Sequence, residues 1–341
     1  MNPLFEEKRI FLVGGPGGVG KTTLAASLAV SLAEAGHRTV VLTIDPARRL
    51  AQALGFDRFH SDLQKIPVAG KGELFASMLD VERYFDRVIE KFATSPEQKE
   101  KVLGNPLYRT MVDSLGGSHE YAAMERLLEF ARDKSFDKVI VDTPPSDNAR
   151  ELFEAPQRLA DFMDNSVLRW FQGGGKLYTQ FFRTGTKLAM GALKLVFGSE
   201  FLDSLGGFLA DLEGMQAGFR GRNLEVLEVL RSKDAAFLLV SVPSEARALD
   251  CQTFRQTLKE KEIPLASLLF NRMEPAAPDA KSSGDIQRLI EYQKAIHDQQ
   301  EDWAEKMRQG FKGPVIAIPR VTGALHDVKS LSELGQRITQ R

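Results

Sequence analysis

Short, almost continuous apolar runs alternate along the chain with segments of helical periodicity. Such runs are typical of strands covered on both faces, and their alternation with helices predicts right-handed βαβ units. We expect strands at residues 10–13, 39–43, 74–79, 138–141, 236–240, 265–271 and 315–318. The pattern therefore predicts the α/β class, with a doubly wound, mostly parallel sheet.

Two long stretches interrupt this alternation. Residues 82–133 read as helices joined by a loop that contains glycine and proline, and residues 155–233 are helical in pattern without a convincing strand. We therefore expect a single domain over residues 1–341, with an α-helical subdomain built from about 82–133 and 155–233.

Composition narrows the partners that such a domain could have. The formal net charge is −1, which argues against a global electrostatic attraction to nucleic acid or anionic lipid. The single cysteine, Cys251, excludes a disulfide or a cysteine-rich metal site within one chain, so no zinc is expected. The N-terminus is acidic and no uncharged apolar stretch reaches about eighteen residues, so we expect a cytoplasmic protein.

A glycine-rich loop follows the first predicted strand and leads into a helical run over residues 24–35. It reads G-G-P-G-G-V-G-K-T-T over residues 14–23. Its form is that of a P-loop, G-x-x-x-x-G-K-T, whose backbone N–H groups surround a polyphosphate. An incidental glycine-rich turn is the alternative, and the flanking strand and helix count against it. The residues expected to bind nucleotide are Gly15, Pro16, Gly17, Gly18, Val19, Gly20, Lys21, Thr22 and Thr23.

Within this loop, two side chains have distinct expected roles. Lys21 places a positive charge at the β- and γ-phosphates, and the Thr22 hydroxyl can ligate Mg²⁺. The dipole of the following helix favours the same anion. The sequence therefore predicts a site for a nucleoside triphosphate, ATP, with Mg²⁺ as cofactor.

Two aspartates fall at the carboxyl ends of predicted strands, where ligands bind in parallel α/β sheets. Asp45, in L-T-I-D-P-A-R-R-L, can position the attacking water or hold it against the Mg²⁺ shell, and it also suits a helix N-cap. Asp142 ends V-I-V-D-T-P-P, the form of a Walker B strand, and would orient Mg²⁺ through water. Thr143, Pro144 and Pro145 then form a stiff loop suited to sensing the γ-phosphate.

These motifs together resemble the ArsA family of P-loop ATPases, whose Walker A is of the deviant type. That family spans arsenical-pump ATPases and ATPases that target tail-anchored membrane proteins. The matching segments run in family order from residue 10 to about 272, with a weaker match to about 328: G-G-V-G-K-T-T-L-A, T-I-D-P-A-R-R-L-A, G-G-S-H-E-Y-A-A-M-E-R-L, V-D-T-P-P-S-D-N-A-R-E-L-F-E-A-P-Q-R-L, L-V-S-V-P-S-E, L-L-F-N-R and I-P-R-V-T-G-A-L-H-D-V. Two motifs within them, D-P-A-R-R-L and E-A-P-Q-R-L, point to the bacterial branch often labelled anion-transporting ATPase.

The resemblance implies roles for further residues. Asp45 would be the switch I aspartate that activates water, with Lys21 as the second catalytic group, and Asp142 to Pro145 would be switch II. Asn271 would read the adenine, for which its paired amide donor and acceptor suit the ring edge. A strand-end turn residue is the alternative for Asn271. The loop that packs on the base would include Pro319, Arg320 and Val321.

Two departures from the family pattern bear on its dimer. The family's loop usually carries a second lysine that reaches the partner's nucleotide, and here Pro16 stands at that position. Arg48 and Arg49 are our candidates to replace it. Cys251 alone cannot supply the thiolates of arsenite activation or of a zinc-bridged dimer. A nucleotide-dependent homodimer is implied by the resemblance, and Pro16 weakens the case for it.

The helical stretch is the remaining functional candidate. Lys176, Arg183, Lys187 and Lys194 share one helix face, opposite apolar residues such as Phe181. In the targeting ATPases this region builds a groove for a hydrophobic client helix. An ordinary helical layer and a basic helix resting on lipid are the alternatives. We expect an ATP-gated switch that handles a hydrophobic protein segment or a membrane partner. A ParA/MinD-like ATPase acting on DNA or membrane, an arsenite-pump ATPase and a metabolic kinase remain as other classes.

Overall fold

The computed structural model describes residues 1–43, 49–56, 62–79, 81–114, 118–143, 153–154, 204–205, 207–208, 211–212, 216–278, 283–321, 323, 325 and 327–340. They divide into two compact units. The first comprises residues 1–79, 123–153 and 226–341, and the second comprises residues 80–122 and 154–225.

An eight-stranded sheet forms the centre of the first unit. Its order is β3-β4-β2-β5-β1-β6-β7-β8, and every neighbouring pair is parallel except β3–β4. The strands are β1 (Ile10–Gly14), β2 (Arg38–Thr43), β3 (Gln64–Ile66), β4 (Glu73–Met78), β5 (Lys138–Asp142), β6 (Ala235–Ser241), β7 (Leu265–Met273) and β8 (Val315–Pro319). The predicted α/β class and its mostly parallel sheet are confirmed, and all seven predicted strands are present.

The eighth strand, β3, is the one that the sequence pattern did not indicate. It pairs antiparallel with β4, through Lys65 opposite Phe75 and Ile66 opposite Leu74. It is three residues long, Gln-Lys-Ile, and only Ile66 is buried. A short polar edge strand carries no run of apolar residues, so hydrophobic periodicity could not reveal it.

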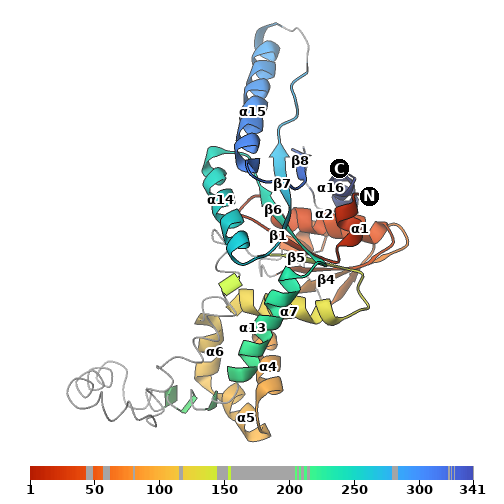
Figure 1. The fold of residues 1–341 in the computed structure, drawn as a ribbon. Helices are drawn as coiled ribbons and strands as arrows, with labels where there is room; N and C mark the ends of the chain where they lie inside the picture. Colours follow the sequence, from red (N-terminus) through yellow and green to blue (C-terminus); the bar gives the residue numbers. More distant parts are fainter. Residues whose placement is uncertain are drawn as a thin grey trace, which may run out of the picture. The chain divides into compact units, whose positions relative to one another are not determined.

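Helices cover both faces of the sheet. The described helices are α1 (Pro3–Glu7), α2 (Lys21–Glu34), α3 (Arg49–Ala53), α4 (Val81–Phe92), α5 (Pro96–Gly104), α6 (Pro106–Ser114), α7 (Ser118–Arg132), α13 (Gln216–Arg231), α14 (Glu245–Glu260), α15 (Gly284–Arg308) and α16 (Val328–Thr339). In the first unit, α2 and α16 lie together on one side of the sheet and α14 lies on the other (Figure 1). The strands are therefore buried on both faces, which explains their continuous apolar runs.

The core on the α14 side is aromatic. The ring of Phe237 in β6 lies 5.5 Å from that of Phe254 in α14 and 6.0 Å from that of Phe153. On the other side, Ala236, Leu238 and Val240 of the same strand belong to the apolar cluster that includes α2. The side chains of β6 therefore alternate between the two faces of the sheet.

The second unit is helical in its described part. Tyr84 and Phe85 of α4 pack against Tyr121 of α7, with ring centroids 6.2 and 5.9 Å apart. Tyr108 of α6 donates its hydroxyl to Asp86 at 3.1 Å. α7 and α13 each contribute residues to both units. Among the described residues, no helix is long and apolar enough to cross a membrane.

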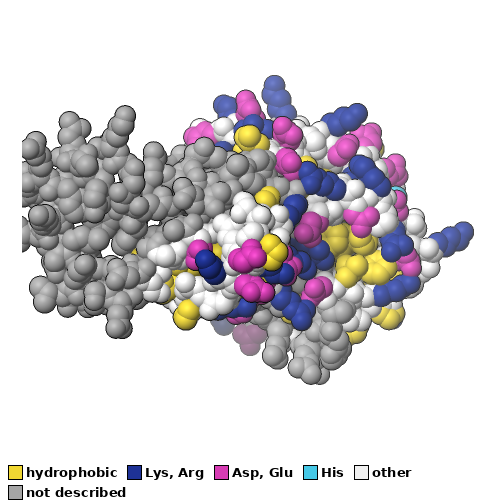
Figure 2. Space-filling view, turned by 90° about the horizontal axis from the view of Figure 1, so that it is seen from below, with side chains coloured by type: hydrophobic (Ala, Val, Ile, Leu, Met, Phe, Trp, Pro, Cys, Tyr) yellow, Lys and Arg dark blue, Asp and Glu magenta, His cyan; other side chains and the backbone are white. Residues whose placement is uncertain are grey.

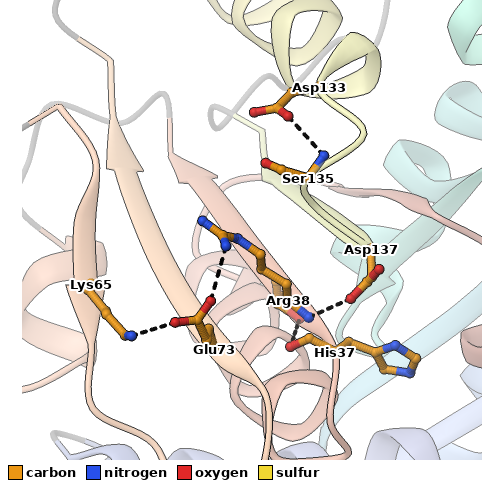
Figure 3. Close-up of polar contacts among 8 residues, drawn as sticks. His37, Arg38, Lys65, Glu73, Asp133, Ser135 and Asp137 are labelled. Carbon is orange, nitrogen blue, oxygen red and sulfur yellow. Dashed lines mark hydrogen bonds and ion pairs between the residues drawn. The ribbon is translucent and has the colours of Figure 1, made fainter.

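A polar network joins the amino ends of the strands at the β3 side of the sheet (Figure 3). Arg38 at the start of β2 pairs with Glu73 at 3.3 Å, and Glu73 also pairs with Lys65 at 2.5 Å. Asp137 accepts the backbone N–H of Arg38 at 2.7 Å. The opposite charges lie at the amino ends of the strands, away from the carboxyl ends where a ligand would bind. We therefore assign the network a structural role, which is to hold β3, β4, β2 and β5 together.

Candidate functional site

The glycine-rich loop lies between the carboxyl end of β1 and the first turn of α2, at the centre of the sheet. A Cβ on Gly14 would come within 2.2 Å of the Phe237 ring, and one on Gly15 within 2.1 Å of the Val240 carbonyl oxygen. Gly20 has φ 95°, and a Cβ there would come within 2.5 Å of Nδ2 of Asn271. The loop is therefore pressed against β6 and β7 where only glycine fits.

Three carbonyl oxygens of the loop accept hydrogen bonds from side chains. Lys21 Nζ donates to Pro16 at 2.9 Å, Arg247 donates to Gly17 at 3.1 Å, and Asn271 Nδ2 donates to Val19 at 2.8 Å. These donors come from α2, α14 and β7, so three elements determine the shape of the loop.

The orientation of those carbonyls fixes the orientation of the following N–H groups. In the described part of the chain no peptide bond is cis, and a trans peptide places its C=O and N–H on opposite sides. The N–H groups of Gly17, Gly18 and Gly20 thus each point away from the donor that holds the preceding carbonyl. N–H groups that converge on one point can form an anion-binding nest.

The first turn of α2 completes the loop. Its N-cap, Gly20, makes no side-chain capping bond, and the first turn contains no acidic residue. Lys21 is buried, whereas Thr22 and Thr23 are half-buried. A helix start without a competing carboxylate favours a bound anion.

A buried carboxylate lies at the end of β5, the neighbour of β1. Asp142 is only 1% exposed, and it accepts a hydrogen bond from the Thr43 hydroxyl at 3.1 Å. Thr143 donates both its backbone N–H, at 3.2 Å, and its hydroxyl, at 3.1 Å, to the Val13 carbonyl. The start of the predicted switch II is thereby joined to the strand that carries the loop.

The two segments predicted to surround the base lie at the ends of β7 and β8. Asn271 is nearly buried, and one of its amide hydrogens is already used by Val19. Arg320 donates its N–H to the Met273 carbonyl at 2.8 Å and pairs with Glu274 at 3.6 Å, while Val321 is exposed. The sequence predicted that Asn271 reads the base, with a strand-end turn residue as the alternative, and did not indicate its contact with the loop.

Arg247 is a contact of the loop that the sequence motifs did not indicate. It lies in the first turn of α14, where the helix dipole disfavours a cation. That unfavourable position, shortly after the V-P-S-E segment, was the signal that could have identified it.

Several predicted residues lie outside the described part of the chain. They include the catalytic candidate Asp45, the cross-dimer candidate Arg48, the switch II prolines Pro144 and Pro145, and the basic residues of 176–194. Arg49 begins α3, and its side chain is likewise outside the description. The described residues contain no group of three or more His, Cys, Asp or Glu side chains placed to hold a metal ion.

The chain was compared with known protein families and with individual proteins. A family model described as "Anion-transporting ATPase" matches residues 8–340. The chain is 29% identical over 304 residues to "ATPase GET3B" of Arabidopsis thaliana, covering 81% of this chain and 67% of that protein. It is 26% identical over 296 residues to "ATPase GET3C" of the same plant, covering 79% and 68%. A "Putative arsenical pump-driving ATPase" of Halobacterium salinarum is 33% identical over 168 residues, covering 47% of this chain and 25% of that protein.

Proposed function

The chain belongs to the ArsA family of anion-transporting ATPases and is an ATP hydrolase, and from this premise we propose that residues 15–23 bind Mg·ATP, with Asp45 and Lys21 as catalytic groups. The observation that carries the proposal is the arrangement of the loop carbonyls. Because Pro16, Gly17 and Val19 are each held by a side-chain donor, the loop N–H groups are oriented before a ligand arrives. Such preorganised donors bind a polyphosphate without the cost of ordering the loop.

Lys21 and Asp45 have complementary proposed roles. The Lys21 ammonium, which donates to the Pro16 carbonyl, would also contact the β- and γ-phosphates and offset their negative charge. Asp45 would orient the attacking water and accept its proton. Hydrolysis would then be reported through Asp142, Thr143, Pro144 and Pro145, of which Thr143 is bound to the strand that carries the loop.

The side chains of the site suit Mg²⁺. Thr22 offers a hydroxyl, and Asp142 and Asp45 offer carboxylates through water, which are the oxygen donors that this ion prefers. Mg²⁺ usually keeps several waters and shares phosphate oxygens, so one hydroxyl and carboxylates that act through water would be sufficient protein donors. Bound there, the ion would offset charge on the phosphate oxygens.

We assign the adenine to the ends of β7 and β8. With one amide hydrogen donated to Val19, Asn271 keeps its Oδ1 and its second N–H for the edge of the base. Pro319, Arg320 and Val321 would pack on the ring.

The proposed output is an ATP-gated switch that handles a hydrophobic protein segment or a membrane partner from the cytoplasm, as a homodimer. The chain would act as one ATPase domain over 1–341 with a helical subdomain from about 82–133 and 155–233. α7 and α13 support this because each belongs in part to the sheet unit and in part to the helical unit.

On the face seen in Figure 2, the described basic and acidic side chains are interspersed, which gives no support to a broad nucleic-acid surface.

The test combines ATP turnover with particle size. We would measure both without nucleotide, with ADP and with ATP, for the wild type, for Asp45→Asn and for Asp285→Asn. Asp285 is 92% exposed on α15 and serves as the matched control. We expect Asp45→Asn to lower turnover at least a hundredfold, to bind ATP still, and to accumulate as an ATP-bound dimer.

Each part of the proposal can fail separately. Unchanged turnover in Asp45→Asn would remove its catalytic role. A monomer under every condition would remove the nucleotide-gated dimer and leave a solitary switch. Turnover stimulated by DNA or by anionic vesicles, and lost steeply with salt, would instead favour the ParA/MinD-like class.

A further inference from the structure

Arg247 contacts the phosphate loop from an element to which no nucleotide role has been assigned. Its guanidinium donates through one terminal nitrogen to the Gly17 carbonyl and through the other to Oδ2 of Asp250, each at 3.1 Å. Asp250 lies one turn further along α14 and is half-buried, as is Arg247. The carboxylate holds the planar guanidinium in place, so its second nitrogen is directed at the loop.

The carbonyl that Arg247 holds belongs to the peptide between two glycines. Gly18 has φ 76°, and a Cβ placed on it would meet nothing within 4 Å. A side chain on Gly18 would thus meet no neighbour, and without one glycine allows the adjoining peptide to rotate at little cost. Of the contacts made by the described residues, the Arg247 bond is what fixes the direction of the Gly17 carbonyl, and with it the direction of the Gly18 N–H.

The other two donors to the loop come from α2 and β7. An ammonium has three N–H donors, so Lys21 can contact phosphate without releasing the Pro16 carbonyl, and Arg247 and Asn271 can likewise keep their bonds while a ligand is present. The unfavourable position of a cation in the first turn of α14 is also explained by this contact.

We infer that Arg247 is a positioning residue of the phosphate loop: by holding the Gly17 carbonyl it presents the Gly18 N–H to the polyphosphate of ATP or ADP. The inference rests on the nucleotide site proposed above. It gives α14 a direct connection to the loop at the residue next to Pro16.

The experiment measures ADP affinity by calorimetry and ATP turnover for Arg247→Ala, Arg247→Lys and Arg255→Ala. Arg255 is a matched control, because it lies on the same helix and also donates to two carbonyls, those of Met307 and Gln309, away from the loop. We expect Arg247→Ala to weaken ADP binding roughly tenfold and to raise KM for ATP similarly, with kcat changed less than about threefold, as for the loss of one charge-assisted anchor. Arg247→Lys should recover part of the affinity, and Arg255→Ala should match the wild type.

Three results would overturn the inference. They are wild-type affinity in Arg247→Ala, an equal loss in Arg255→Ala, or a loss of kcat with KM unchanged. If Arg247→Ala does not fold, Asp250→Ala serves instead, since it keeps the arginine but removes the acceptor that holds the guanidinium; affinity equal to the wild type in that variant would contradict the inference. A wild-type protein that binds no ADP would contradict the proposed site itself, and is thereby distinguished from a failure of Arg247 alone.

Discussion

Several buried and half-buried cations in this protein donate hydrogen bonds to backbone carbonyls. Lys138, at the start of β5, donates from Nζ to the carbonyls of Phe5, Glu6 and Lys8, at 2.7 to 2.8 Å. Burial lowers the pKa of this ammonium, and the nearby Asp137 and Glu6 oppose the shift. The contact joins the end of α1 to the sheet. The sequence pattern placed residue 138 in a strand but did not indicate that its side chain binds the carbonyls near α1.

We expect His37 to make the stability of the fold depend on pH, because its pKa is lowered in the folded chain. Burial lowers its pKa first, the charge of Lys138 lowers it further, and Asp137 and Glu6 raise it. A histidine with a lowered folded-state pKa binds its proton more readily in the unfolded chain. Stability is therefore full above the unfolded pKa of about 6.5 and falls as the pH drops from there toward the folded pKa.

We expect His37→Gln to reduce this loss between about pH 7 and pH 5. Urea midpoints for the variant and the wild type would be compared across that range, and at pH 8, where the imidazole is neutral in both states, to remove effects unrelated to charge. The same slope in both proteins would show that His37 does not carry the acid sensitivity.

At the level of elements, the C-terminus of α7 is held by a residue from another part of the chain. Arg9, which precedes β1, donates to the carbonyls of Ala131 and Asp133 at 2.6 Å and of Phe130 and Phe136 at 3.1 Å. These bonds satisfy carbonyls at the end of the helix and place a cation at its negative pole. The strand that carries the phosphate loop is thereby fixed to a helix that extends into the helical unit.

Arg9→Ala should lower the free energy of unfolding by about 2 kcal/mol, because three partly buried carbonyls and one exposed carbonyl lose a charged donor at once. Hydrogen exchange in the last turn of α7, together with the urea midpoint, would measure the effect. Arg288→Ala removes an exposed ion pair on α15 and should change stability by less than about 0.5 kcal/mol. Equal effects of the two substitutions would argue against the capping role.

At the level of the whole molecule, the N-terminal and C-terminal segments of the chain contact each other beside the helix that follows the loop. The backbone N–H of Asn2 donates to the Thr339 carbonyl at 2.6 Å, and Ser31 of α2 shares a hydrogen bond with Thr339 of α16 at 2.9 Å. A Cβ on Gly335 would come within 2.1 Å of the Ser27 carbonyl, so α16 lies directly against α2. The helix that begins at the loop is thus buried by the last helix of the chain.

Ligand binding should therefore stabilise this sheet unit as a whole. At an ADP concentration about a hundred times Kd, we expect roughly 2.7 kcal/mol of added stability for a ligand that binds only the folded state. Lys21→Ala should lose most of this gain, and Lys294→Ala, an exposed residue of α15, should retain it. Urea unfolding with and without ADP measures the difference, and a full gain in Lys21→Ala would contradict its place at the phosphates.

Much of the architecture was predictable because it depends on local pattern. A strand buried on both faces needs a continuous apolar run, and seven strands, such as that at residues 236–240, could be recognised by it. The short edge strand β3 has no such run and could not be recognised. The glycine-rich loop was recognisable for a similar reason, since backbone conformations like those of Gly15 and Gly20 require glycine at fixed spacing, and its binding of phosphate remains a prediction. The roles of Asp45 and of the helical stretch remain predictions.

The contacts that shape the loop could not be predicted, because their residues are far apart in the chain. Asn271 meets Val19, and Arg247 meets Gly17, only after β6 and β7 take their places beside β1. By itself the sequence determined that this chain folds as an α/β ATPase with a glycine-rich loop after its first strand, since periodicity and glycine spacing are local properties. Only the tertiary structure decided which side chains hold the loop carbonyls and so orient its N–H groups, because hydrogen bonds across more than 200 residues depend on the order of the strands.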